Sequence, residues 1–259
     1  MPLRQDTSPP RGISEGASSK TTRSPAGADA HDEHRTRADL LSNFILGSQD
    51  GLVNVLGILL GLSAATSDLR LIYVAAFAAL GAESISMGAV AYTSTLAKRK
   101  QYLKGVEREQ REINDVPKLE RDEVRDIFRH WGYTGEKLER ATEAIVDNPK
   151  AWVQFMMSYE LNLEPVSKSE PHESFLIVLG STVFGSLVPL IPYLLGSGNV
   201  LESAIGSVVL SGCLLFFIGW YEARTTVGSL WKSGLQMAAI GLAAGVAGFL
   251  IGHFIGAPP

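Results

Sequence analysis

The chain has 259 residues, a formal net charge of −4 and a positive mean hydropathy, which is high for a soluble domain. The mild acidity excludes nucleic-acid binding through a basic surface. The single cysteine, Cys213, excludes a disulfide framework or a cysteine-based zinc site within one chain. Apolar residues gather in blocks that match the roughly 20 residues needed to cross a bilayer, so the composition indicates a membrane protein.

Residues 1–38 are rich in Ser, Thr, Pro, Gly and charge, and they contain almost no aliphatic residues. Such a composition predicts a disordered N-terminal tail. Nothing in it resembles the apolar core of a secretory signal, so we expect the tail to be retained.

Five apolar blocks predict an all-α membrane protein with five transmembrane helices. Two of them fall within residues 39–97, separated only by the turn TSDLR, and three fall within residues 174–259. Their expected bounds are about Leu40–Thr66, Leu71–Leu96, Phe175–Leu195, Val200–Tyr221 and Ser233–Ile255. Many Gly, Ala and Ser residues recur at four-residue spacing in these blocks, as at Gly57 and Gly61, which allows helix backbones to approach closely within a bundle or across a dimer.

Residues 98–173 form a helical insert between the second and third membrane helices. Within residues 101–173 there are 16 Asp and Glu against 11 Lys and Arg, a net charge of −5. Pro117, Gly132 and Asn148-Pro149 punctuate the insert. The helices expected between them are Tyr102–Asp115, Lys118–His130, Glu136–Asp147 and Lys150–Leu163.

The basic residues flanking the membrane helices predict the orientation of the chain. Arg35 and Arg37 precede the first helix, Lys98–Lys100 follow the second, and Arg224 and Lys232 lie between the fourth and fifth. Positive flanks favour the cytoplasm, so the N-terminus and the insert are expected inside and the C-terminus outside, against one arginine in the turn TSDLR. The lack of a targeting segment favours the inner membrane of a bacterium over an organelle.

Polar residues form a stripe down the first membrane helix. Asn43, Gly47, Asp50 and Asn54 recur at spacings of four, three and four, which places them on one helix face. A carboxylate within hydrocarbon costs several kcal/mol and normally faces the bundle interior on an ion or proton path. The alternative is a protonated Asp50 that only hydrogen-bonds to a neighbouring helix.

The second membrane helix carries a matching pair of residues. Glu83 and Met87 lie one turn apart, with Ser84 and Ser86 beside them. A second carboxylate and a thioether at this depth strengthen the interpretation of an ion path.

The insert repeats a pair of carboxylates three residues apart. Glu109 and Glu112 lie on one helix, and Glu120 and Glu123 lie on the next. Near the end of the insert, Met156, Met157 and Glu160 share a helix face. Carboxylate oxygens together with thioether sulfurs suit a first-row divalent metal better than calcium.

Spacing alone favours a simpler explanation of these carboxylates. A solvated helical surface with ion pairs such as Glu107–Arg111 explains them, and the two methionines then pack in a core. A di-iron enzyme is excluded because no histidine follows a Glu by three residues. Phosphate-binding loops are also absent, so the chain is neither an ATP-driven pump nor, by these motifs, an enzyme.

Four stretches resemble the vacuolar iron transporter family, in its bacterial branch with a cytosolic metal-binding insert. In chain order they are QDGLVN, ESISMGAVAYTS, AWVQFMMSYELNLEP and GSLVPLIPYLL. The resemblance runs from about Ala38 to the end of the chain and leaves out the tail.

The resemblance implies a homodimer that exports Fe²⁺ and often Mn²⁺ from the cytosol in exchange for protons, with Zn²⁺ and Co²⁺ as further candidates and no permanent cofactor. It implies that Asp50 and Met87 are the intramembrane ligands. The ligands that it implies in the insert are Glu109, Glu112, Glu120, Glu123, Met156, Met157 and Glu160. One departure concerns Ala79, where eukaryotic members carry a Glu, and Glu83, one turn closer to Met87, is the candidate to replace it.

Two other classes of function fit the same features. A membrane-anchored metal sensor or interaction protein would use the insert to bind partners, but it would gain nothing from Asp50 and Glu83 in the membrane. A transporter of another solute would use the insert only for dimerisation.

Overall fold

The computed structural model describes residues 26–196, 198–225 and 228–256, and all regular structure in these ranges is helical. Met1–Ala38 forms one unit and Asp39–Pro259 another, and the packing described below lies within the second. Residues 1–25 of the predicted tail lie outside the described ranges, and α1 begins at Ala26. The helices are α1 (Ala26–Ala65), α2 (Leu69–Asp115), α3 (Pro117–His130), α4 (Gly135–Val146), α5 (Pro149–Tyr159), α6 (Glu170–Leu195), α7 (Val200–Thr225) and α8 (Leu230–Gly256).

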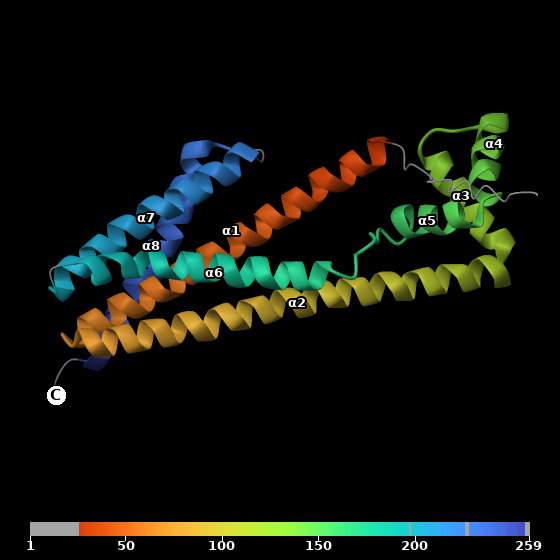
Figure 1. Cartoon of the computed structure of the whole chain (residues 1–259). Coiled ribbons are helices and arrows are strands. Elements are labelled where there is room, and N and C mark those ends of the chain that lie inside the picture. The colour runs from red at the N-terminus through yellow and green to blue at the C-terminus, as the bar shows by residue number, and fades with distance from the viewer. Residues whose placement is uncertain (1–25, 197, 226–227, 257–259) are drawn as a thin grey trace, which may run out of the picture. The chain divides into compact units, whose positions relative to one another are not determined.

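Five of these helices are long and apolar enough to cross a membrane, as the sequence predicts. They lie in α1 from Leu40 onward, in α2, and in α6, α7 and α8. Helix α6 runs beside α2, and α7 and α8 lie side by side (Figure 1). The described part of the chain is therefore an all-α membrane protein.

The second membrane helix and the first helix of the insert are one continuous helix, α2, of 47 residues. The prediction of a separate helix at Tyr102–Asp115 is wrong. The stretch between Leu96 and Tyr102, AKRKQ, is charged but consists of good helix formers, so the change from apolar to polar composition does not interrupt the backbone. Figure 1 shows α2 extending past α6 to the small helices of the insert.

The remaining helices of the insert end near the residues that the sequence indicates. Pro117 occupies the first turn of α3, and the side chain of Asn148 accepts hydrogen bonds from the backbone N–H groups of Lys150 and Ala151 at the start of α5. Gly132 has φ +89° in the turn after α3, a conformation that favours glycine. Helix α5 ends at Tyr159, earlier than the predicted Leu163, and Glu160 caps it.

The insert has a small apolar core of its own. Val124 and Phe128 of α3, Leu138 of α4, and Trp152 and Phe155 of α5 are its buried members, together with Met156. This core fixes α3, α4 and α5 against one another, and α5 also contacts α2.

Glycines bring the membrane helices into close contact, as their spacing predicts. A Cβ added to Gly61 of α1 would lie 2.9 Å from the carbonyl oxygen of Gly248 in α8, and one added to Gly47 would lie 2.9 Å from that of Val178 in α6. Both distances are shorter than van der Waals contact, so α1 packs backbone-to-backbone against α6 and α8. This packing fixes the polar stripe of α1 in position.

Candidate metal sites in the insert and the membrane

Three carboxylates from three different helices converge in the insert. They belong to Glu109 on α2, Glu120 on α3 and Glu160 at the end of α5, and one oxygen from each lies within 4.8 Å of the others. The break at Pro117 turns the chain back so that α3 presents Glu120 to Glu109, and the contact between α5 and α2 brings in Glu160. We refer to these three residues as the acidic cluster.

Two of the three carboxylates in the acidic cluster, those of Glu109 and Glu120, are buried, whereas Glu160 is exposed. Glu109 is 0% exposed and Glu120 is 3% exposed. Both carboxylate oxygens of Glu109 and Oε2 of Glu120 are buried without a hydrogen-bond partner within the described residues. Buried carboxylates normally have donors, so these oxygens have the character of ligands without a cation.

Burial and mutual repulsion raise the pKa of all three carboxyl groups of the cluster above the ordinary value. Burial raises the pKa of Glu120 to about 7, and the negative charges of Glu123, Glu109 and Glu112 add to this effect. Partial burial raises the pKa of Glu160 to about 7 as well, with added contributions from Glu109 and Glu123. A divalent cation would replace these protons and remove the repulsion.

Glu112 and Glu123, also predicted as ligands, lie at the edge of the cluster. Their charges act on Glu120, so both are near it, but neither belongs to the converging set of three. Arg108 Nε donates to both carboxylate oxygens of Glu112 at 3.0 Å. The ion pair expected from the sequence, Glu107–Arg111, is not formed as such, since Arg111 Nε donates instead to the backbone carbonyl of Glu107.

The two predicted methionine ligands are both buried. Met156 is 0% exposed and belongs to the apolar core of the insert. Met157 is 1% exposed and packs against Gly105 of α2, where a Cβ would lie 3.2 Å from its Sδ. Since Gly105 lies one turn before Glu109, Met157 is the thioether on the cluster's side of α5.

In the membrane, the structure brings together Asn54 of α1 and Glu83 of α2. Asn54 Nδ2 donates a hydrogen bond to Glu83 Oε1. The charge and side chain of Asp50 also act on Glu83, so the two acids lie close together. The polar stripe on α1 therefore meets the acidic residue of α2.

The antiparallel pairing of α1 and α2 sets the level of Met87. One turn back from Asn54 on α1 is Asp50, and one turn forward from Glu83 on α2 is Met87. Because the two helices are antiparallel, both steps lead toward the N-terminal end of α1. Asp50 and Met87 therefore lie at about the same height along the helix pair, one turn away from Asn54 and Glu83. Asn43 is half-buried two turns further toward the insert end of α1.

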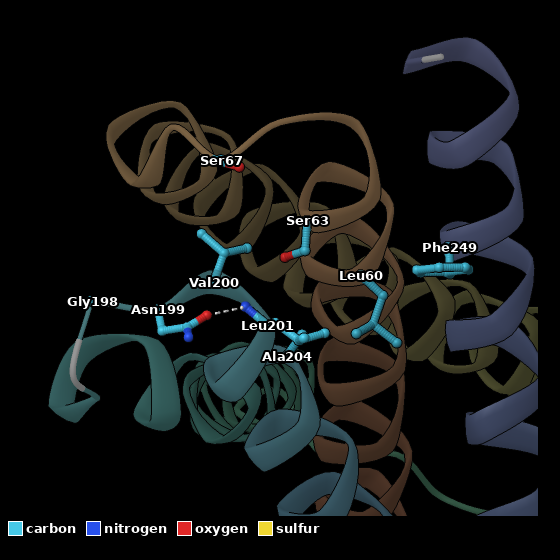
Figure 2. A pocket seen from close by; sticks show the side chains of 9 residues that line it. All are labelled: Leu60, Ser63, Ser67, Gly198, Asn199, Val200, Leu201, Ala204 and Phe249. Atoms are coloured by element: carbon cyan, nitrogen blue, oxygen red, sulfur yellow. Dashed lines mark hydrogen bonds between the residues drawn. The ribbon is translucent and has the colours of Figure 1, made fainter.

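A cavity of about 380 Å³ lies near the C-terminal end of α1 (Figure 2). It is lined by Leu60 and Ser63 of α1, the first turn of α7 and Phe249 of α8, and by none of the predicted site residues. Asn199 Oδ1 in its wall already accepts a hydrogen bond from Leu201 N, which caps α7 (Figure 2). The described residues that line the cavity supply hydroxyl, amide and apolar contacts and no carboxylate.

Sequence reasoning did not identify Arg108 as part of the insert site. The signal was present, because Arg108 and Glu112 are four residues apart and such pairs meet on a helix surface. The same spacing links Glu107 with Arg111, and only the structure separates the two.

Fold and site together define an all-α integral membrane protein with an acidic helical insert between its second and third spans. The family model described as VIT family matches residues 41–253. The chain is 35% identical over 225 residues to vacuolar iron transporter 2 of Oryza sativa subsp. japonica, covering 85% of this chain and 90% of that protein. It is 30% identical over 228 residues to vacuolar iron transporter 1 of Arabidopsis thaliana, covering 88% and 91%.

A more distant relative is the protein CCC1 of Saccharomyces cerevisiae, 27% identical over 221 residues, which cover 82% of this chain and 68% of that protein. The chain belongs to the VIT family, and the resemblance noted in the sequence is confirmed.

Proposed function

We propose that this protein exports divalent first-row metal ions, Fe²⁺ and Mn²⁺ first among them, from the cytosol in exchange for protons. The acidic cluster of the insert captures the ion, and Asp50, Glu83 and Met87 pass it through the membrane. The observation that carries the proposal is the convergence of Glu109, Glu120 and Glu160, in which Glu109 and Glu120 have buried oxygens without a hydrogen-bond partner among the described residues.

The donor set of the cluster favours a divalent metal over other cations. Three carboxylates within one ion's reach, with a thioether beside them, combine hard and soft ligands. A monovalent ion would leave most of the repulsion among the carboxylates in place. The names of the plant relatives, which are called vacuolar iron transporters, agree with iron as a cargo.

The membrane step rests on the pair Asp50 and Glu83. Two acids close together in a membrane-spanning region are costly unless they bind a cation or a proton. We infer that a metal ion sheds part of its hydration shell to Asp50 and Met87, with Glu83 at the next level, and that protons arriving from outside displace it. Glu83 thereby takes the part of the glutamate that is missing at Ala79.

We further propose that two copies of the chain form the transporter. Asn54 is exposed within one chain although it lies in the middle of a membrane-spanning helix. A polar amide is unfavourable against lipid, and a second copy packed along this face of α1 would cover it. The basic residues flanking α1, α2 and α8 favour a cytoplasmic insert, and we place the protein in a bacterial inner membrane.

A membrane-anchored sensor and a transporter of another solute are the competing functions. Neither needs both the acidic cluster and the polar contact between Asn54 and Glu83. Transport measurements on the full-length chain in proteoliposomes separate the three possibilities.

The experiment compares the uptake of Fe²⁺, Mn²⁺, Zn²⁺ and Co²⁺ with and without a pH gradient, alongside control vesicles that lack the protein. We expect the flux of Fe²⁺ and Mn²⁺ to be saturable and to be faster when the compartment that receives the metal is the more acidic one. The flux should acidify the compartment that donates the metal. Absence of flux for all four ions would reject transport, and flux that ignores the pH gradient would reject proton exchange.

A further inference from the structure

Arg108 lies beside the acidic cluster, on the turn of α2 that carries Glu109. Its Nε donates to both carboxylate oxygens of Glu112 at 3.0 Å, four residues along the same helix. The side chains are 54% and 34% exposed, so this is a pair at the surface. Such pairs are weak individually and are easily exchanged for other partners.

The positive charge of Arg108 reaches beyond Glu112. It acts on Glu109, Glu120 and Glu160, the three residues of the acidic cluster. In the absence of a metal ion, Arg108 therefore partly compensates the negative charge of the whole cluster.

Glu112 is placed to join the cluster but is occupied elsewhere. It lies three residues from Glu109 on the same face of α2, and its charge acts on both Glu109 and Glu120. Both of its carboxylate oxygens accept hydrogen bonds from Arg108. Glu109 converges with Glu120 and Glu160, whereas Glu112 does not.

We propose that Arg108 is a resident counter-cation of the metal site, which holds Glu112 out of the site and is displaced when a divalent ion binds. The proposal rests on the proposed capture of metal by the acidic cluster and adds a regulating residue to it. An arriving ion repels the guanidinium, the exposed pair with Glu112 opens, and Glu112 supplies a further carboxylate oxygen to the ion. Return of Arg108 to Glu112 favours release of the ion toward the membrane, so the residue limits the affinity of the capture site.

The insert contains a matched pair that lacks this relationship. Arg140 Nη2 donates to Glu136 Oε1 at 2.6 Å, also at a spacing of four residues, on the exposed surface of α4. Neither residue belongs to the acidic cluster. Arg140→Gln therefore removes one arginine charge and one helix-surface ion pair from the insert without touching the metal site.

The test measures Mn²⁺ affinity of the full-length chain in detergent by calorimetry, at low ionic strength and at about pH 8. We compare the unsubstituted chain, Arg108→Gln, Arg140→Gln, Glu112→Gln and the double variant Arg108→Gln/Glu112→Gln, with circular dichroism as the check on folding. Removing the positive charge of Arg108 from beside the acidic cluster removes a repulsion on the bound ion. We therefore expect Arg108→Gln to bind Mn²⁺ about threefold to tenfold more tightly. Arg140→Gln leaves the affinity unchanged, and the gain from Arg108→Gln is smaller in the Glu112→Gln background.

The opposing outcomes are distinct. Unchanged or weaker Mn²⁺ binding by Arg108→Gln would overturn the role of Arg108, as would an equal gain in the Glu112→Gln background or a matching gain in Arg140→Gln. These results leave metal capture standing as long as the unsubstituted chain binds Mn²⁺ and Glu120→Gln loses that binding. If the unsubstituted chain binds no Mn²⁺, both this proposal and metal capture fail.

Discussion

The molecule withdraws carboxylates from water in two places, and it treats them differently. In the membrane, Glu83 has a hydrogen-bond donor in Asn54 and an acidic neighbour in Asp50. In the insert, neither oxygen of Glu109 has a donor among the residues that the structure describes. A carboxylate with a donor is stable without an ion, whereas one without a donor gains most when a cation arrives. This difference supports the proposal that the membrane residues pass the ion on and that the acidic cluster captures it.

The two places are connected by a single helix. Glu83 and Glu109 both lie on α2, about 39 Å apart at a rise of 1.5 Å per residue. An ion cannot touch both at once, so the proposed capture and the proposed translocation are separate steps. Substitutions in one place should leave the other step intact.

The largest expected effect comes from Asp50→Asn, which removes the charge but keeps the shape of the side chain. We expect metal flux in proteoliposomes to disappear. The membrane helices should stay folded, because α1 keeps its packing through Gly47 and Gly61, and Mn²⁺ binding by the insert should be unchanged. The control is Glu202→Gln at the start of α7, which removes a carboxylate at the end of another membrane helix. Flux of Asp50→Asn equal to that of the unsubstituted chain would contradict the membrane step.

The second effect concerns capture. Glu109→Gln/Glu120→Gln removes two of the three converging ligands, and we expect Mn²⁺ affinity to fall by about 100-fold, at the upper end of losses seen when a site's supporting groups are removed. Calorimetry on the full-length chain measures this change. The matched control, Glu136→Gln/Glu143→Gln, removes the same charge from α4, and an equal loss of affinity there would indicate a general charge effect in place of ligation.

The pH dependence of the insert follows from the raised pKa of about 7 for Glu120 and Glu160. Below that pH the cluster holds protons, which compete with the metal, so Mn²⁺ affinity should rise as the pH increases from about 6 to about 8. Calorimetry in two buffers of different ionisation enthalpy should detect the released protons. An affinity that stays flat across this range would contradict the assignment.

The same pKa values predict the stability of the metal-free insert. Both folded-state values lie above the ordinary value of 4.5, so the folded state binds more protons than the unfolded state between these limits. Stability therefore falls as the pH rises through about 7. Thermal unfolding followed with and without Mn²⁺ should show this loss and its reversal by the metal, and a metal-free midpoint that rises across the same range would have the wrong sign.

The smallest effect separates a thioether ligand from core packing. Met157→Leu keeps the apolar volume and removes the sulfur, so the free energy of unfolding should change by less than about 1.5 kcal/mol. We expect Co²⁺ affinity to fall by about threefold while Mn²⁺ affinity changes less, because the softer ion gains more from sulfur. Met237→Leu in α8 is the control, and equal changes for both ions would assign Met157 to packing.

Much of the fold could be predicted from the sequence because its signals are local. The five apolar blocks, Pro117 and Asn148-Pro149 mark boundaries that depend on the residues next to them. The wrongly predicted break between Leu96 and Tyr102 rests on the change from apolar to polar residues, which marks where the helix leaves the membrane and not where it ends. Nothing in that stretch disfavours a helix, so α2 continues.

The acidic cluster was less predictable. Spacing placed Glu109 and Glu112 on one face, but it could not show that Glu109 turns inward while Glu112 pairs with Arg108. That choice depends on how α3 and α5 fold back on α2, which is a tertiary property. The pairing of Asn54 with Glu83 also depends on the register between two helices, which sequence periodicity does not contain.

The division between capture and translocation is tested most directly by the initial rate of Mn²⁺ uptake into proteoliposomes as a function of Mn²⁺ concentration. The same curve is measured for the unsubstituted chain, for Glu109→Gln/Glu120→Gln and for Asp50→Asn. We predict that the insert variant needs more Mn²⁺ but reaches the unsubstituted plateau, whereas Asp50→Asn has no measurable plateau at any concentration. An insert variant with a normal half-saturating concentration and a lowered plateau, or an Asp50→Asn curve that reaches the normal plateau, would contradict it.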